Sequence, residues 1–273
     1  MPNSIDLDAI AADVLKAQDG AAQVAPFTGR HAGFDLPAAY QVAHRVEALR
    51  RAQGWTPVGR KIGFTNAALW PVFGVDQPIW GTVYDRTLVM LDGHNPHHSL
   101  RGLVSPKIEP EIVFRLRHVP APDAEPAELL AAIEWVAPGF EIVQSHYPDW
   151  KFGAADTVAT GGLHGRLFLG PPMRLADLGP NAWQALEDFS LALTCNGALR
   201  DSGRGANVLG HPALALAHLV RLIAGQAGVS PLRPGEIVTT GTVTGAHSVA
   251  AGETWRAATE GLGWSALEVR FTD

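Results

Sequence analysis

The feature that most constrains the fold is the frequency of short β-branched runs punctuated by glycine and proline, with few helical stretches between them. Such a pattern favours a mixed or antiparallel sheet structure over a doubly wound fold, in which strands alternate with helices. Strands are predicted near residues 57–63, 82–90, 107–117, 138–144, 165–169, 190–199, 236–240, 248–257 and 265–271. Helices are predicted within this β-rich part near 125–135 and 212–225. The segment 94–98 is predicted to be a polar loop.

Two amphipathic helices are predicted before the β-rich part. Ser4 can cap the first helix, and the second runs from Pro37 to Gly54. Their inward faces are predicted to carry Leu7, Ile10, Ala11, Val14 and Leu15, and then Tyr40, Ala43, Val46 and Leu49. We therefore expect an α+β protein with a largely helical N-terminal subdomain over residues 1–80 and a β-rich domain over 81–273.

Composition excludes several classes of function. The formal net charge of -6 over 273 residues argues against a nucleic-acid surface, which needs a basic patch. The first twenty residues lack the basic and apolar regions of a signal peptide, and residues 212–225 are too short and too polar to span a bilayer. Cys195, the single cysteine, cannot form an internal disulfide, and its apolar strand context before Asn196-Gly197 indicates a structural role. We expect a cytoplasmic protein with no membrane partner.

The most informative stretch is a predicted strand that carries Glu109 and Glu111 on either side of Pro110. Residues two apart on a strand point to the same face, so the two carboxylates project together. They repel each other unless a positive group lies between them, and a hard cation such as Mg²⁺ or Mn²⁺ is the usual solution. The alternative is a solvent-facing edge strand, where Pro110 blocks pairing.

Two further residues fit such a site. Glu141 is a lone acid in an otherwise apolar run, where a carboxylate is costly unless it is paired or bound to metal; the alternative is a strand with one wet face. Lys61, bracketed by glycines, could bind a carboxylate or move protons. Taken alone, Lys61 is better interpreted as a surface lysine.

Other polar residues give weaker signals. Lys151 and Asp156 flank Phe152, and they form either a second polar patch facing a ligand or an ordinary ion pair. His97 and His98 are predicted to be loop residues. The eleven histidines show no zinc-binding spacing.

Taken in order, the motifs resemble the 2-oxopent-4-enoate hydratase and 4-oxalocrotonate decarboxylase family, a branch of the fumarylacetoacetate hydrolase-like superfamily. The resemblance runs from about Val58 to Phe271. The blocks that carry it are residues 59–65, 74–78, 109–111, 140–143, 149–151, 208–212, 235–245 and 261–263.

This resemblance implies a mostly β, fumarylacetoacetase-like catalytic core of mixed sheets forming a β-roll, in a homo-oligomeric enzyme. It implies that Glu109, Glu111 and Glu141 hold Mg²⁺ or Mn²⁺, and it places Lys61 in the active site. Weaker candidates for contacts with the substrate are Thr65, Ile79, Lys151, His164 and Thr242. A further expected partner is an enzyme of the same pathway.

The chain departs from the family pattern at two places. The hydratases carry an acid where this chain has Ile79, and the decarboxylases resemble this chain in having an apolar residue there. A run that reads Asp-Asn-Ala-Ser-Ser-Gly in the family is replaced by residues 160–165, with His164 in place of one of its polar groups.

The expected reaction is hydration of a 2-hydroxy-2,4-dienoate, or its 2-oxo-4-enoate tautomer, to a 4-hydroxy-2-oxo acid in the catabolism of aromatic compounds. A 4-oxalocrotonate-type decarboxylase is the first alternative, and a C–C bond hydrolase of the same superfamily is the next. A protein that binds 2-oxo acids without catalysis is the alternative from another class.

Overall fold

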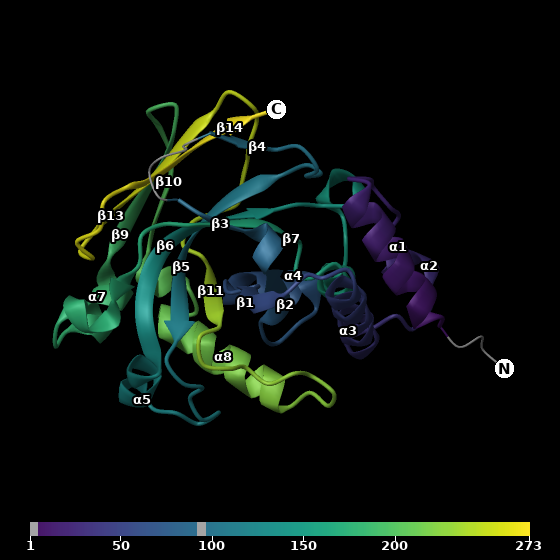
Figure 1. The fold of residues 1–273 in the computed structure, drawn as a ribbon, viewed down its shortest axis with the longest axis horizontal. Helices are drawn as coiled ribbons and strands as arrows, with labels where there is room; N and C mark the ends of the chain where they lie inside the picture. The colour runs from purple at the N-terminus through teal and green to yellow at the C-terminus, as the bar shows by residue number, and fades with distance from the viewer. Residues whose placement is uncertain (1–4, 92–96) are drawn as a thin grey trace.

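The computed structural model describes residues 5–91 and 97–273. A layer of N-terminal helices lies beside two β-sheets, and one long helix packs beneath the larger sheet (Figure 1). The expected α+β architecture is confirmed.

The helical layer is formed by α1 (Leu7–Asp19), α2 (Phe27–Arg30) and α3 (Leu36–Ala52). Asp6 caps α1 by accepting two backbone hydrogen bonds, while the predicted cap, Ser4, lies outside the described residues. On α3, Leu49 is 42% exposed, so its predicted inward position is wrong. The buried stripe ends instead on Arg50, which reaches Asp19 of α1 at 2.7 Å.

The larger sheet has nine strands in the order β2-β1-β11-β5-β6-β7-β3, with β12 paired to β5 and β8 paired to β6. Its strands are β1 (Pro57–Gly63), β2 (Ile79–Tyr84), β3 (Leu88–Met90), β5 (Lys107–Leu116), β6 (Ile133–Val143), β7 (His164–Leu169), β8 (Met173–Arg174), β11 (Ile237–Thr242) and β12 (His247–Ser248). The β1–β11 and β3–β7 pairs are parallel and the others antiparallel, so the sheet is mixed.

The second sheet has the order β10-β9-β13-β14-β4. Its strands are β4 (His97–Ser99), β9 (Ser190–Cys195), β10 (Ala198–Arg204), β13 (Thr254–Glu260) and β14 (Leu267–Thr272). The prediction that His97 and His98 are loop residues is wrong, because β4 pairs with β14; residues 92–96 lie outside the described part. The single strand predicted over 190–199 is a hairpin, since Asn196 and Gly197 both adopt positive φ.

The other helices are α4 (Trp70–Phe73), α5 (Pro126–Ala131), α6 (Ala154–Ala159), α7 (Ala182–Asp188) and α8 (Pro212–Ala224). Within the described residues, one run, Gly205–Ala224, is long and apolar enough to cross a membrane by length and composition. It is longer than predicted because a short 3-10 turn precedes α8. However, 61% of that apolar window is buried inside the protein, as in a core helix.

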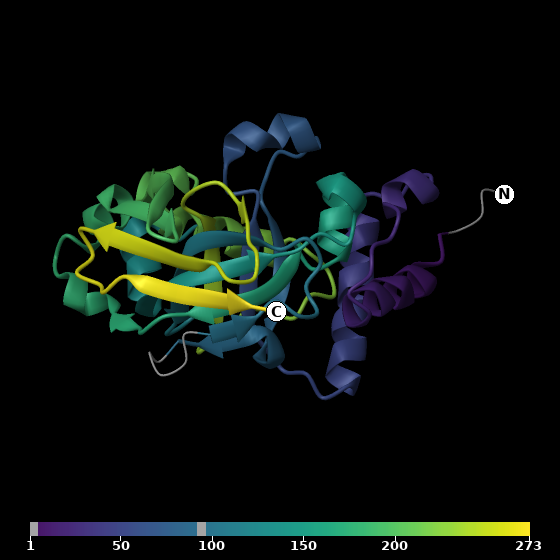
Figure 2. The same ribbon diagram turned by 90° about the horizontal axis from the view of Figure 1, so that it is seen from above.

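The larger sheet curls so that its first strand approaches the segment before β7. A Cβ atom added at Gly81 of β2 would lie 2.1 Å from the carbonyl oxygen of Gly161, so only glycine permits this backbone contact. Figure 2 shows the curled sheet from above, with α4 standing away from the rest of the molecule. The curl gives the sheet an inner and an outer face.

The two faces follow the alternation of side chains along each strand. On β5, even-numbered residues such as Ile108 and Phe114 enter the main core with α8, on the outer face. Odd-numbered residues point inward. One end of the inner face is apolar and is built from Val83, Val113, Ala137, Leu167, Leu169 and Ile237. The other end carries the glutamates.

Candidate metal centre and active site

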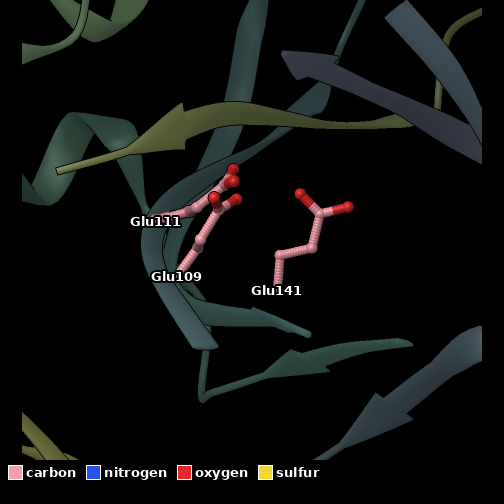
Figure 3. Close-up of side chains that lie close together, drawn as sticks. All are labelled: Glu109, Glu111 and Glu141. Carbon is pink, nitrogen blue, oxygen red and sulfur yellow. The ribbon is translucent and has the colours of Figure 1, made fainter. Parts of the chain in front are cut away.

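Three glutamates meet at the polar end of the inner face. Glu109 and Glu111 come from β5, and Glu141 lies directly opposite Glu109 on the neighbouring strand β6. One carboxylate oxygen from each residue lies within 4.8 Å of the others. Figure 3 shows the three carboxylates converging from the two strands. Glu111 and Glu141 are buried, and Glu109 is partly exposed.

The alternative of a solvent-facing edge strand is excluded for β5, because β5 pairs on one side with β6 and on the other with β11 and β12. Pro110 is tolerated inside the sheet. Its carbonyl accepts a hydrogen bond from the backbone of Val243, so its missing N–H lies on the same side. There the ladder with β11 is already interrupted between Thr239 and Thr242.

Lys61 provides a buried positive charge for this cluster. It projects from β1, is 3% exposed, and places Nζ 3.1 Å from a carboxylate oxygen of Glu141. Nζ also donates a hydrogen bond to the carbonyl of Gly162 at 2.9 Å. The interpretation of Lys61 as a surface lysine is therefore wrong.

His164 contacts the other oxygen of Glu141. Its Nδ1 lies 2.7 Å from that oxygen, and its Nε2 lies 2.8 Å from the hydroxyl of Thr87. Lys61 and His164 thus fix Glu141 from two sides.

The three carboxyl groups of the cluster have pKa values shifted in different directions. Burial raises the pKa of Glu109 to about 7, although Lys61 opposes that shift. Burial and the charge of Glu141 raise the pKa of Glu111 well above its usual range. Burial also acts to raise the pKa of Glu141, but Lys61 and His164 together outweigh it and lower that pKa to about 2. For Lys61, burial alone would lower the pKa, and the three glutamates together raise it.

The donor set fits a hard divalent cation. Oε2 of Glu111 accepts a hydrogen bond from the backbone N–H of Gly241 at 2.9 Å, whereas its buried Oε1 has no hydrogen-bond partner among the described residues. A buried carboxylate oxygen without a donor is costly unless a cation faces it. Three carboxylates against one lysine leave a negative excess that a divalent cation would neutralise.

Four of the weaker candidates lie around this cluster. His164 touches Glu141, and Thr242 is the register partner of Glu111 on β11. Buried Thr65 packs so closely on Gly241 that a Cβ atom there would meet its hydroxyl at 2.0 Å. Ile79 and the Lys61 amine lie on the same side of Gly63: a Cβ there would be 3.1 Å from Cγ1 of Ile79 and 3.7 Å from Nζ of Lys61.

Lys151 and Asp156 are not brought to the cluster. The Lys151 side chain is 82% exposed and lies 3.6 Å from Asp149. Asp156 is fully buried and accepts hydrogen bonds from the backbone and hydroxyl of Thr28, which ties α6 to α2. Neither the polar patch nor the ion pair considered for these two residues forms.

Two residues that contribute to the site were not predicted from the sequence. Thr87 holds His164, and Gly162 presents its carbonyl to Lys61. A side chain at Gly162 would collide with Lys61, since a Cβ atom would lie 2.7 Å from Cδ of the lysine. The paired glycines 161 and 162, both with positive φ, were the signal that could have indicated a close backbone approach.

The fold agrees with comparisons to known proteins. The family model for the C-terminal domain of fumarylacetoacetate (FAA) hydrolase matches residues 91–270. The chain belongs to the FAA hydrolase family.

Within that family, the chain is similar to both hydratases and decarboxylases. It is 34% identical to a 2-hydroxyhexa-2,4-dienoate hydratase of Comamonas testosteroni, over 95% of each chain. It is 33% identical to a 4-oxalocrotonate decarboxylase of Pseudomonas sp. (strain CF600), over 82% of this chain and 81% of the other. The solved 4-oxalocrotonate decarboxylase from Pseudomonas putida G7, in complex with magnesium and adipate, superposes with a TM-score of 0.87 at 27% identity and covers 97% of each chain.

Proposed function

We propose that this protein is a metal-dependent lyase that hydrates a 2-hydroxy-2,4-dienoate, or its 2-oxo-4-enoate tautomer, to a 4-hydroxy-2-oxo acid in the breakdown of aromatic compounds. The observation that carries the proposal is the convergence of Glu109, Glu111 and Glu141 beside a buried Lys61. Relatives named as a 2-hydroxyhexa-2,4-dienoate hydratase and a 2-keto-4-pentenoate hydratase, which match nearly the whole chain, support the choice of substrate class.

The three glutamates would hold Mg²⁺ or Mn²⁺, which when bound would supply a Lewis acid to stabilise negative charge on the substrate. Lys61 remains protonated beside three carboxylates, so it can bind the substrate carboxylate or deliver a proton to carbon as the dienol becomes a ketone. Protonation at C5 with loss of the enol proton gives a 2-oxo-3-enoate, in which C4 is electrophilic. Water then adds its hydroxyl to C4 and a proton to C3. Thr65 and Thr242 provide hydroxyl groups near the cluster that can orient the substrate.

A 4-oxalocrotonate-type decarboxylase is the second candidate, and Ile79 favours it. This side chain is buried close to Lys61 and has no group that could activate water. An apolar wall suits the loss of a remote carboxylate as carbon dioxide, with the electron pair passing into the enolate and a proton then returning to carbon.

We also propose a ligand class, an oligomeric state and a cellular location for the enzyme. Its partner is a small 2-oxo or 2-hydroxydienoic acid rather than nucleic acid or membrane, and we propose a homo-oligomer that can associate with an enzyme of the same pathway. A cytoplasmic location is compatible with the buried free thiol of Cys195.

Mass spectrometry of the product would test the proposal, with freshly generated 2-hydroxypenta-2,4-dienoate and 2-hydroxymuconate offered separately, each with Mg²⁺ and with EDTA. Metal-dependent gain of one water by the first substrate is the expected result. Metal-dependent loss of carbon dioxide from the second would replace the hydratase with the decarboxylase. Turnover that persists unchanged in EDTA would exclude a metal-dependent reaction.

A further inference from the structure

A cleft of about 220 Å³ lies between the helical layer and the larger sheet, next to the glutamate cluster but separate from it. None of the three glutamates lines it, nor does Lys61. His164 and Thr87 line it, so the hydrogen bond between these two residues lies in the wall that separates the cleft from Glu141.

The cleft is positively charged in a protein of net charge -6. Arg50, Arg86, Arg101 and Arg166 line it, against two acidic residues, Asp19 and Glu47. Asp19 pairs with Arg50 at 2.7 Å, which leaves three of the four arginines. Glu47 pairs at 3.0 Å with Arg51, which does not line the cleft.

The remaining guanidinium groups have no acidic partner in the described part of the chain. Arg166 donates one hydrogen bond, to the carbonyl of Ser99 at 2.7 Å, and burial lowers its pKa. Arg86 lies 5.5 Å from the ring centre of Trp55 and forms no ion pair with any described residue. Arg86 and Arg101 are exposed, whereas Arg166 is half-buried. A half-buried guanidinium without a counter-charge is costly, so an anion bound in the cleft beside Arg166 would offset that cost.

The walls add a constraint on shape. Trp55, Trp80 and Tyr84 line the cleft. Trp55 and Tyr84 are partly exposed, whereas Trp80 is only 3% exposed. Gln144 also lines it and is 7% exposed; its oxygen is occupied by the backbone N–H of Val104, which leaves the amide nitrogen as a donor. The volume is below the roughly 300–1,000 Å³ of pockets for drug-sized ligands, which restricts the ligand to a small molecule.

We propose that this cleft is a second binding site, for a small planar carboxylate with an unsaturated or aromatic body, and that His164 couples it to the metal centre. The carboxylate would pair with Arg166 and Arg86, and the flat body would lie against Trp55 and Tyr84. A ligand that displaces Thr87 or His164 also moves Glu141, which His164 holds at 2.7 Å. By thermodynamic linkage, the ligand and the metal then change each other's affinity by the same factor.

Calorimetric titration with benzoate tests the site apart from the proposed reaction, on metal-free Glu111→Gln protein, in which the metal centre is disabled. Saturable binding of benzoate is expected. The affinity should be at least tenfold weaker in the double variant Glu111→Gln/Arg166→Gln. It should be unchanged in the control Glu111→Gln/Arg174→Gln, since Arg174 is an exposed arginine paired with Asp177. Inorganic phosphate should bind less tightly than benzoate. Equal affinities for benzoate and phosphate would mean that the cleft attracts any anion, which would overturn the proposed selectivity for a planar carboxylate. The absence of saturable benzoate binding would overturn the proposal as a whole.

The coupling is tested with the otherwise wild-type chain. Mg²⁺ affinity measured with and without saturating benzoate should differ by a few-fold or more, and Thr87→Val, which removes the hydroxyl that holds His164, should shrink that difference. An Mg²⁺ affinity indifferent to benzoate would overturn the coupling. If the cleft is instead covered by a second copy of the chain, Arg166→Gln would change the oligomeric state on size-exclusion chromatography while benzoate would fail to bind, which also overturns the proposal.

Discussion

The two ends of the inner face of the larger sheet are built from the same strands, but one end buries apolar side chains and the other buries charged ones. At one end, Val113 and Leu169 belong to an apolar cluster that requires only tight packing. At the other, Glu111 lies two residues from Val113 on the same face of β5, with its charge buried. The alternation of side chains along β5 places both Glu111 and Val113 on the inner face. Whether such a position stabilises the fold or contributes to the site therefore depends on which amino acid occupies it.

This comparison shows how stability and chemistry are divided along one strand. The apolar end gains free energy from burial in the protein alone. The charged end is stabilised only in part by Lys61 and His164, and it leaves the Glu111 Oε1 atom without a hydrogen-bond partner among the described residues. Variants at the two ends should therefore separate folding from function.

The largest effect is expected for Glu111→Gln. Metal-dependent turnover should fall by at least about 10³-fold, since loss of a charged ligand removes several kcal/mol of stabilisation in the transition state. The metal-free protein should be no less stable, because Gln can still accept the hydrogen bond of Gly241 and carries no buried charge. Steady-state kinetics and thermal unfolding in EDTA measure the two effects.

Glu134→Gln is the matched control, since Glu134 lies on β6 and is 43% exposed beside Arg115. It should retain wild-type turnover. Equal losses in Glu134→Gln and Glu111→Gln would contradict a special role for the inner glutamates.

Lys61→Met should lower turnover by about 10²–10⁴-fold through loss of the proton donor. Unlike Glu111→Gln, it should not weaken Mg²⁺ binding, because the three carboxylates remain and a neighbouring positive charge is gone. Parallel kinetics and Mg²⁺ titrations check this. Lys151→Met, on a lysine that is 82% exposed, is expected to stay near wild type; a comparable loss of turnover there would return Lys151 to the site.

Leu169→Ala probes the apolar end. It should lower the free energy of unfolding by about 2–5 kcal/mol, because Leu169 is 2% exposed and its truncation leaves a cavity. The Mg²⁺ affinity of the folded protein should stay within about threefold of wild type. Denaturant unfolding and calorimetry provide the two values, and a large loss of metal affinity would mean that the two ends are not independent.

The smallest effect is expected from pH. Because burial raises the pKa of Glu109 to about 7, a proton must leave this carboxyl before a cation can bind at lower pH. Mg²⁺ affinity should therefore weaken by at least about tenfold as the pH falls from 8 to 6, since the raised pKa of Glu111 acts in the same direction. Titration calorimetry in buffers of different ionisation enthalpy should also detect proton release near pH 7. Affinity that does not change over this range would argue against a protonated Glu109 in the metal-free protein.

Part of the site could be predicted from local spacing. The two-residue spacing of Glu109 and Glu111 was sufficient to place both on one face of a strand. Glu141 stood out because an acid in an apolar run needs a partner. Family resemblance added Lys61, which local pattern alone had assigned to the surface, because the sequence beside it does not reveal that β1 lies between β2 and β11.

The remainder depends on tertiary contacts that no local pattern encodes. Thr87 and Gly162 come from turns, and they enter the site because the sheet curls until β2 approaches the segment before β7. Similarly, Arg50 is buried in place of the predicted Leu49, because the position of α1 selects which face of α3 is covered.

The wide separation of the contacting residues along the chain has a consequence for biosynthesis. Gly241 donates to Glu111 across 130 residues, and Lys61 reaches Gly162 across 101. A chain emerging from the ribosome presents its carboxylate ligands long before Gly241 has been translated. The hydrogen bond that holds Glu111 therefore forms only late in synthesis, after β11 has been made and has paired with β5.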